Sequence, residues 1–291
     1  MNDLLQQWSE SAKSWREHSA TIRTMFTPLT NALIEEAGIS AGQAVLDVAG
    51  GPGEPSLTIA DVVGPTGSVT YTDAVAEMVA TAEDEAKRRG LSNISFHQTP
   101  AESLPFADNS FDATVSRLGV MLFSDPPAAL RQMLRVTKPH GAVCFVVWGS
   151  NERNPFTSVV TNVMSRYVDT PPEDPDAPGA FRFAERGKLA RLLTEAGAKD
   201  VKERELNYHM AAPISVEEFW RMRAATSGTL REKVAKLPPA KAQQLGIEVQ
   251  NAAREYFPND RMNFPAQMLV ISGRKQATPE LVSGCKIDDP N

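Results

Sequence analysis

Residues 44–56, with the sequence AVLDVAGGPGEPS, constrain the fold of this chain more than any other stretch. The apolar residues around Asp47 predict a short buried strand, and a cluster of glycines follows it directly. Glycine permits turns that bulkier residues disfavour, and it lets a ligand come close to the backbone. A helix expected over residues 55–63 would direct the positive end of its dipole toward that ligand. A strand, a glycine turn and a helix in this order predict a nucleotide-type binding site.

The alternation of strands and helices continues along the chain. We expect strands over residues 44–48, 68–72, 94–97, 112–116, 141–148, 200–208 and 267–272. We expect helices over residues 55–63, 75–89, 126–137 and 185–196, and a helical segment over 215–257 that breaks near 237–239. This alternation is typical of a parallel sheet with helices on both faces. The predicted fold class is α/β: a Rossmann-like, doubly wound, mostly parallel seven-stranded sheet with N-terminal helices and a late helical insertion as a lid.

The N-terminal residues 4–37 have a helical pattern that should end at Gly38. Thr27-Pro28 is expected to divide the segment, because proline disrupts a helix interior. Trp8 and Trp15 are seven residues apart, so they share one face of a continuous helix. Either both tryptophans are packing residues, or this segment covers the ligand loop.

Four parts follow from these patterns. We expect an N-terminal helical lid (1–38), a ligand-binding Rossmann-like core (39–150), the rest of the sheet with a substrate-lid insertion (151–275) and a polar, disordered tail (276–291).

Composition excludes several classes of function. The formal net charge of −6 argues against non-specific binding to nucleic acid or to anionic membranes, because both need a basic face. No apolar run is long enough for a membrane span, and the N-terminus has no signal-peptide pattern. The two cysteines, Cys144 and Cys285, are expected to be free thiols in a reducing compartment, so we expect a cytoplasmic protein. No residue cluster has metal-ligand spacing, so no metal site is expected.

The acids beside the glycines point away from a dinucleotide. The stretch from Gly51 to Ser56 lacks the third glycine of a G-x-G-x-x-G motif, and Asp47 precedes the glycines. A pyrophosphate gains nothing from a carboxylate there, whereas an ammonium group does. Asp73, at the end of the next strand, could accept hydrogen bonds from both ribose hydroxyls, or it could cap the following helix. S-adenosylmethionine has both an ammonium group and a ribose.

Four stretches together resemble a known family. Asp47–Gly53 and Tyr71–Asp73 resemble motif I and the second acidic motif of class I S-adenosylmethionine-dependent methyltransferases. Ala101–Asp112 and Arg135–Gly141 resemble the ubiquinone/menaquinone biosynthesis C-methyltransferase branch, which is methyltransferase type 11-like. The resemblance covers about residues 40–150. It implies the class I fold, S-adenosyl-L-methionine as cofactor and a methyltransferase activity (EC 2.1.1).

The resemblance also implies which residues hold the cofactor. They are Trp15, Asp47, Ala49, Gly50, Gly51, Gly53, Asp73, Ala74, Met78, Ala101, Glu102, Ser116 and Arg117. Ala49 stands where the family usually has the first glycine of the loop. Pro100 stands where members often have an aspartate, so adenine recognition is lost or moves to Glu102, Thr99 or the backbone.

The chemistry of methyl transfer mainly requires positioning of donor and acceptor, and a base helps where a proton must leave. The catalytic candidates are His18, His209 and Arg117, and Trp148 is expected to form an aromatic wall. The expected partner is a small-molecule acceptor, with C-methylation of a quinol-like ring favoured, and we allow for a homodimer. The alternatives are O- or N-methylation of a natural product and an S-adenosylmethionine-binding protein without transfer activity, which Pro100 favours. A nicotinamide oxidoreductase is disfavoured by Asp47 and the missing glycine.

Overall fold

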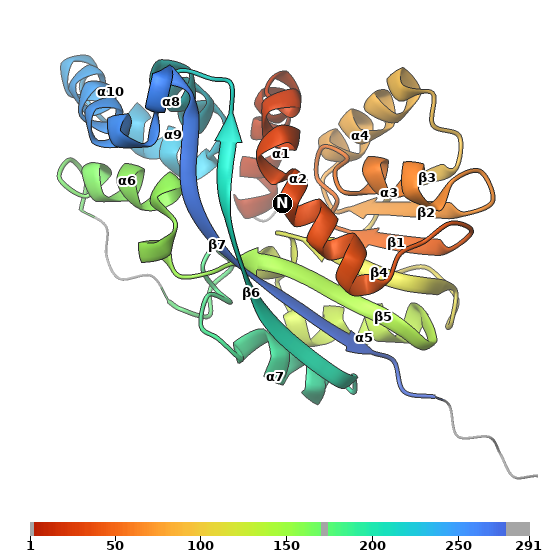
Figure 1. The fold of residues 1–291 in the computed structure, drawn as a ribbon. Coiled ribbons are helices and arrows are strands. Elements are labelled where there is room, and N and C mark those ends of the chain that lie inside the picture. Colours follow the sequence, from red (N-terminus) through yellow and green to blue (C-terminus); the bar gives the residue numbers. More distant parts are fainter. Residues whose placement is uncertain (1–2, 170–173, 278–291) are drawn as a thin grey trace, which may run out of the picture.

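A computed structural model describes residues 3–169 and 174–277 of the chain (Figure 1). In this part, the strands form one seven-stranded sheet in the order β3-β2-β1-β4-β5-β7-β6. The first five strands run parallel to one another, whereas β7 runs antiparallel to both β5 and β6. The predicted fold class, a mostly parallel and doubly wound sheet, is confirmed.

The elements have the following bounds. The strands are β1 (Ala44–Val48), β2 (Ser68–Asp73), β3 (Ile94–Gln98), β4 (Phe111–Arg117), β5 (Thr137–Trp148), β6 (Lys199–Ala212) and β7 (Met262–Arg274). The helices are α1 (Asp3–Glu17), α2 (Ser19–Ala37), α3 (Ser56–Val63), α4 (Ala76–Arg89), α5 (Pro126–Val136), α6 (Pro155–Met164), α7 (Lys188–Glu195), α8 (Val216–Thr226), α9 (Gly228–Ala235) and α10 (Pro239–Ala253). No helix in the described ranges has the length and apolar character needed to cross a lipid bilayer.

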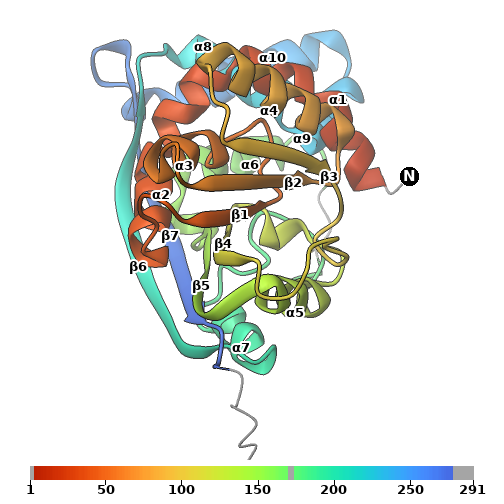
Figure 2. The same ribbon diagram turned by 90° about the vertical axis from the view of Figure 1, so that its right-hand side faces the viewer.

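The core lies on both faces of the central strands. β5 is buried from Ala142 to Trp148, as expected of a strand covered on both faces. Helices α2 and α3 lie on one face, and α5 and α7 lie on the other (Figure 2). Leu29 and Leu33 of α2 are fully buried in this core.

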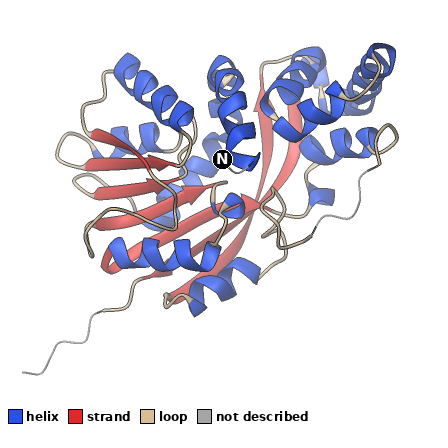
Figure 3. Cartoon of the chain, turned by 180° about the vertical axis from the view of Figure 1, so that it is seen from behind, coloured by secondary structure: helices blue, strands red, loops and turns tan. Residues whose placement is uncertain are grey.

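The last two strands extend beyond the rest of the sheet and carry the helical insertion. β6 has 14 residues and β7 has 13, and α8, α9 and α10 lie between them in the sequence. α1 contacts α4 as well as α8 and α9, so it bridges the first half of the sheet and the insertion (Figures 1 and 3). The carboxyl ends of the parallel strands therefore lie beneath a cover that consists of α1 and the insertion α8 to α10.

The expected division of the N-terminal segment at Thr27-Pro28 is wrong. The break falls at His18, and Pro28 lies inside α2. Proline leaves one helical carbonyl without its backbone donor, but tertiary contacts can override this loss. The neighbouring Thr27 donates its hydroxyl to the Arg23 carbonyl at 2.8 Å. The apolar face of α2 is buried against the sheet and keeps the helix continuous.

Other expectations from the sequence agree more closely with the structure. Gly38 ends α2 with a left-handed φ of 68°. The segment 215–257 breaks near Pro238 as predicted and also at Ser227, whose side chain accepts from the Leu230 N–H. α6 was not predicted. The expected disordered tail lies, from residue 278 onward, outside the described residues.

Replacing Pro28 with alanine should raise the free energy of unfolding by roughly 1–2 kcal/mol, because alanine restores the missing helical N–H and favours the helix. Loss of proline also increases the entropy of the unfolded chain, which offsets about 0.4–1 kcal/mol. Urea denaturation of the two proteins measures the difference. A less stable variant would show that the packing of α2 on the sheet requires the proline.

Candidate active site

The glycine loop between β1 and α3 is fixed against β2. The Gly50 N–H donates to the Thr72 carbonyl at 3.0 Å, and the Gly53 N–H donates to the Gly50 carbonyl at 3.2 Å. A Cβ at Gly50 would lie 2.5 Å from the Tyr71 ring and 2.8 Å from a carboxylate oxygen of Asp47. Only glycine fits at this position without a shift of its neighbours.

The residues on either side of Gly50 adopt the left-handed conformation. The φ angle is 59° at Ala49 and 55° at Gly51. Alanine in this region costs roughly 1–2 kcal/mol, whereas glycine is tolerated without that cost. The position where the family usually has a glycine is therefore one that needs glycine-like backbone angles, and Ala49 adopts them under strain.

Asp47 lies beneath this loop, fully buried. Its Oδ2 accepts a hydrogen bond from the Ser56 hydroxyl at 2.6 Å. Its Oδ1 has no hydrogen-bond partner within the described chain. Burial raises the pKa of Asp47 to about 7, although the Ser56 hydroxyl and the charge of Arg117 both act to lower it.

Asp73 ends β2 and joins the glycine loop to the start of α4. Its Oδ2 accepts from the Gly51 N–H at 3.0 Å, and its Oδ1 accepts from the Val75 N–H at 2.9 Å. Burial raises the pKa of Asp73 to about 6, against the lowering effect of these backbone donors. Val75 occupies the N-cap position of α4, so Asp73 does not cap the helix in the way the alternative prediction required.

A cavity of about 200 Å³ lies above the glycine loop. Most of the predicted cofactor residues line it: Trp15, Ala49, Gly50, Gly51, Asp73, Ala74, Met78, Ala101, Glu102 and Arg117. Asp47, Gly53 and Ser116 are not among its lining residues. Asp47 and Ser116 are buried next to it, and the Ser116 hydroxyl, like Asp47 Oδ1, has no partner within the described chain.

These features fit the expected cofactor, S-adenosylmethionine. Asp73 stands at the cavity wall with carboxylate oxygens that can accept from ribose hydroxyls. The partnerless oxygens of Asp47 and Ser116 would be satisfied by a donor such as an ammonium group or a bridging water. The loop has no side chain at Gly50 and Gly51, which lets a ligand approach its backbone closely.

The backbone near Pro100, where adenine is expected to bind, has N–H groups without hydrogen-bond partners among the described residues. Pro100, Thr99, Ala101 and Glu102 all line the first cavity. The Thr99 hydroxyl donates to the Ser103 carbonyl at 2.8 Å, and Glu102 accepts from the Asp125 N–H at 3.1 Å. The N–H groups of Ala101 and Glu102 have no hydrogen-bond partner in the described part of the chain. Backbone recognition therefore has free groups here, whereas both expected side-chain substitutes are engaged.

A second cavity of about 280 Å³ adjoins the first. Five residues line both cavities and form a shared wall: Trp8, Trp15, Phe26, Leu118 and Leu122. The rest of the second cavity comes largely from α1, α2, residues 178–180, the start of α9 and the ends of β5, α6 and α8, which contribute Trp148, Phe156 and Arg223. Trp148, expected to form an aromatic wall, lines this cavity. Phe156 and Arg223 were not predicted, since the sequence after Trp148 carries no motif that marks them.

The shared wall depends on α1. The Trp8 and Trp15 rings have centroids 5.7 Å apart, which confirms that they lie on one helix face. The Trp15 indole N–H donates to the Thr226 carbonyl at the end of α8, at 3.0 Å. The two tryptophans thus pack against each other and also line the cavity above the loop.

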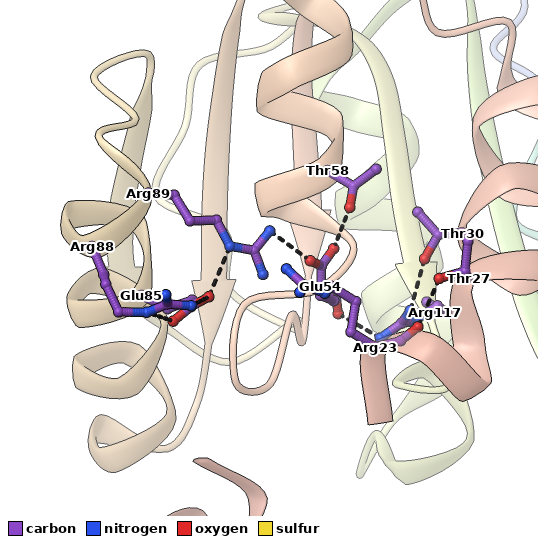
Figure 4. A network of polar contacts seen from close by, with 9 residues as sticks. All are labelled: Arg23, Thr27, Thr30, Glu54, Thr58, Glu85, Arg88, Arg89 and Arg117. Atoms are coloured by element: carbon purple, nitrogen blue, oxygen red, sulfur yellow. Dashed lines mark hydrogen bonds and ion pairs between the residues drawn. The ribbon is translucent and has the colours of Figure 1, made fainter. Parts of the chain in front are cut away.

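Arg117 connects the glycine loop to α2 (Figure 4). Its guanidinium donates to the Thr30 hydroxyl at 2.7 Å and to the Glu54 carbonyl at 3.0 Å, and it lies 5.6 Å from the Phe26 ring centroid. The Glu54 carboxylate in turn pairs with Arg89 at 2.8 Å. Arg117 lines only the first of the two cavities. Its contacts are those of a residue that positions the loop.

The two candidate histidines lie elsewhere. His18 stands between α1 and α2 and lines neither of the adjoining cavities. His209 is exposed on β6, where its Nδ1 lies 3.1 Å from the Asn263 side-chain oxygen, and it lines a separate, shallow depression. The structure does not bring either histidine to the glycine loop.

Asp47→Asn should gain stability relative to the wild type as the pH rises. The pKa of Asp47 is about 7 in the folded chain and 3.8 as a free side chain, so the folded state binds more protons between these values. The wild type therefore loses stability as the pH rises through this window, on the order of 2 kcal/mol from pH 5 to pH 8. Asparagine does not titrate and avoids this loss.

Urea denaturation of the ligand-free wild type and variant at pH 5 and pH 8 measures the effect. The exposed Asp61 on α3 provides the control, because Asp61→Asn should leave the pH dependence of stability unchanged. A constant difference between Asp47→Asn and the wild type at both pH values would contradict the burial of a titrating carboxylate.

Comparison with known proteins shows which sequences this chain resembles. The ubiE/COQ5 methyltransferase family matches residues 21–169. A ubiquinone/menaquinone biosynthesis C-methyltransferase, UbiE of Pseudomonas aeruginosa, is 38% identical over 162 residues, which are 55% of this chain and 56% of that protein. The chain thus aligns with about half the length of this relative.

Solved structures share the fold. YcgJ of Bacillus subtilis is 21% identical with a TM-score of 0.54, covering 86% of this chain and 98% of that one. The cyclase SpnF is 24% identical with a TM-score of 0.53, covering 86% of this chain and 80% of that one. At this level of identity the likeness concerns the fold alone, which can host different chemistry.

Proposed function

Because the chain belongs to the ubiE/COQ5 methyltransferase family, we propose that it transfers a methyl group from S-adenosylmethionine to a small aromatic acceptor. The family match confirms the family and the cofactor class predicted from the sequence. The observation that carries the proposal is the pair of adjoining cavities with a shared wall. One cavity has the polar groups that a nucleoside needs, and the other is lined by aromatic and methionine side chains together with the guanidinium of Arg223. We favour C-methylation of a quinol-like ring, with O-methylation as the alternative.

The first cavity holds the donor in this proposal. Asp73 takes the ribose hydroxyls, the backbone from Ala49 to Gly51 faces the methionine part, and Asp47 supports that loop from beneath. The N–H groups of Ala101 and Glu102 donate hydrogen bonds to the adenine. They take over the role of the aspartate that many family members have at the position of Pro100. The bound cofactor would supply an electrophilic methyl group on its sulfonium sulfur.

The second cavity holds the acceptor. Its aromatic and methionine side chains exclude water and favour a flat apolar ring. We propose that α1, together with α8 to α10, is the lid that closes both cavities. The hydrogen bond from Trp15 to Thr226 joins the two parts of this lid. This agrees with the division of the chain into a lid, a core and an inserted second lid.

Catalysis in this proposal rests on positioning. Neither adjoining cavity is lined by a histidine from the described residues. Holding donor and acceptor at the shared wall converts a bimolecular step into one within a complex, which can supply much of the rate enhancement. Arg117 contributes by fixing the glycine loop to α2.

A methyl-transfer screen tests the function directly. The full chain is incubated with methyl-labelled S-adenosylmethionine and a panel of phenols, quinols and amines, and label in the acceptor is measured. We expect turnover with phenols or quinols. Binding of S-adenosylhomocysteine without label transfer to any acceptor would instead indicate a binding protein without transfer activity.

Asp73→Ala should weaken S-adenosylhomocysteine binding by roughly 1–3 kcal/mol, which is about 5- to 150-fold, because hydrogen bonds to a charged group are lost. Calorimetric titration measures the affinity. Asp84→Ala, which removes an exposed carboxylate from α4, should leave it unchanged.

Asp73 also accepts two backbone N–H groups, so thermal unfolding of each variant must accompany the titration. Asp73→Asn keeps one acceptor oxygen and should lose less affinity than Asp73→Ala. Equal affinity of the wild type and a folded Asp73→Ala would refute the ribose role.

A further inference from the structure

Arg223, on the wall of the second cavity, carries a charge that the chain itself does not neutralise. Its guanidinium carbon lies 4.6 Å from the centroid of the Phe156 ring. Its Nε is buried and has no hydrogen-bond partner among the described residues, and the residue as a whole is half-buried. The side chain makes no hydrogen bond or ion pair within residues 3–169 and 174–277. A charged side chain that is partly removed from water is usually paired, because an isolated charge is costly to desolvate.

Two other arginines that contact this region have hydrogen-bond partners, although the Nε of Arg117, like that of Arg223, has none within the described chain. Arg117 donates to Thr30 and to the Glu54 carbonyl. Arg231, on α9, donates to the Ser11 hydroxyl and pairs with Glu10 at 3.3 Å. Burial lowers the pKa of Arg223 to about 10, so its guanidinium still carries its charge at neutral pH.

The side chains around Arg223 in the second cavity are aromatic and apolar, which suits the binding of an aromatic ring. The Trp148 and Phe156 rings are stacked, with centroids 6.3 Å apart and an interplanar angle of 10°. Met222 and Phe26 add further apolar surface. Among the described residues that line this cavity, Arg223 is the one charged side chain, and none is an aspartate or a glutamate.

We propose that the second cavity binds an aromatic molecule that carries an acidic oxygen group, either a carboxylate or an ionised phenol, and that Arg223 recognises this group. A guanidinium presents paired N–H donors that match a carboxylate and also bind a phenolate oxygen. A protonated amine would meet a like charge in a water-poor site and is disfavoured. The inference rests on the proposed function and narrows its acceptor to phenol-type and acidic rings.

Matched probes separate charge from shape. Naphthoate, naphthamide and naphthylmethylammonium present an anion, a neutral group and a cation on the same ring system. Their binding to the full chain, saturated with S-adenosylhomocysteine, is measured by calorimetry. We expect naphthoate to bind roughly 10-fold or more tightly than naphthamide, since a charge-assisted hydrogen bond is gained, and the cation to bind most weakly.

Variants of Arg223 test the assignment to this residue. Arg223→Met keeps an unbranched side chain over Phe156 and should remove the preference for naphthoate, while leaving the affinity for naphthamide unchanged. Arg223→Lys should retain part of the preference. Arg221→Met makes the same change at an exposed position of α8 and should leave all three affinities unchanged.

A phenol probe tests whether the cavity binds an ionised phenol rather than a carboxylate. The visible absorption of para-nitrophenol reports its ionisation, so titration in the presence of the protein gives the pKa of the bound phenol. We expect binding to the wild type to lower that pKa and binding to Arg223→Met to leave it unshifted. A shift for the phenol without a preference for naphthoate would assign the cavity to phenols, and the reverse would assign it to carboxylates.

The outcomes distinguish this inference from the function on which it rests. Equal affinity for naphthoate and naphthamide, with no shift for the phenol, would overturn the inference. The same holds if a folded Arg223→Met variant keeps the wild-type preference. Failure of S-adenosylhomocysteine to bind would count against the proposed function alone, because the probes can also be titrated against the protein without it.

Discussion

The buried carboxylate of Asp73 ties together the segments that shape the first cavity. One oxygen accepts the Gly51 N–H of the glycine loop, and the other accepts the Val75 N–H ahead of α4. β1 and β2 are parallel neighbours, so their carboxyl ends meet at this edge of the sheet. These amide donors offset part of the cost of burying the carboxylate, whose pKa remains raised. The loop is therefore held in place before a ligand arrives, and a ligand must fit the groups that remain free.

The sequence predicts this part of the molecule well because its signals are local. Apolar runs followed by glycines give the strands and turns, and Asp47 and Asp73 stand at the ends of two successive strands. Strand ends of a parallel sheet converge, so local patterns here also place residues in space. The family, the fold class and the cofactor class follow from the same stretch. The departure at Ala49 is visible in the sequence, and the structure adds its physical meaning as a left-handed backbone.

The second cavity could not be predicted, because its walls come from elements far apart in the chain. Trp15 on α1 meets Thr226 at the end of α8, and no sequence pattern links them. Arg223 looks in the sequence like an ordinary charged residue of a surface helix, and only the packing of α8 places its guanidinium over Phe156 at the wall of the second cavity. The hypothesis for His209 considered that the residue lies near the end of β6, but not which face of the strand its side chain occupies. Because successive side chains of a strand face opposite ways, the buried Met210 leaves His209 on the exposed face.

The charges of the two cavities are complementary to the two reactants of the proposed reaction. Asp47 and Asp73 lie under and beside the cavity for a cationic sulfonium donor, whereas Arg223 faces the cavity for an acidic aromatic acceptor. In the proposed complex, the negative charge of the acceptor would neutralise Arg223 and would attract the positive sulfonium, so binding of each reactant would favour binding of the other. In a water-poor site such attraction is stronger than in solution. An ionised phenol is also already deprotonated at its oxygen, which makes it a better nucleophile without a nearby histidine.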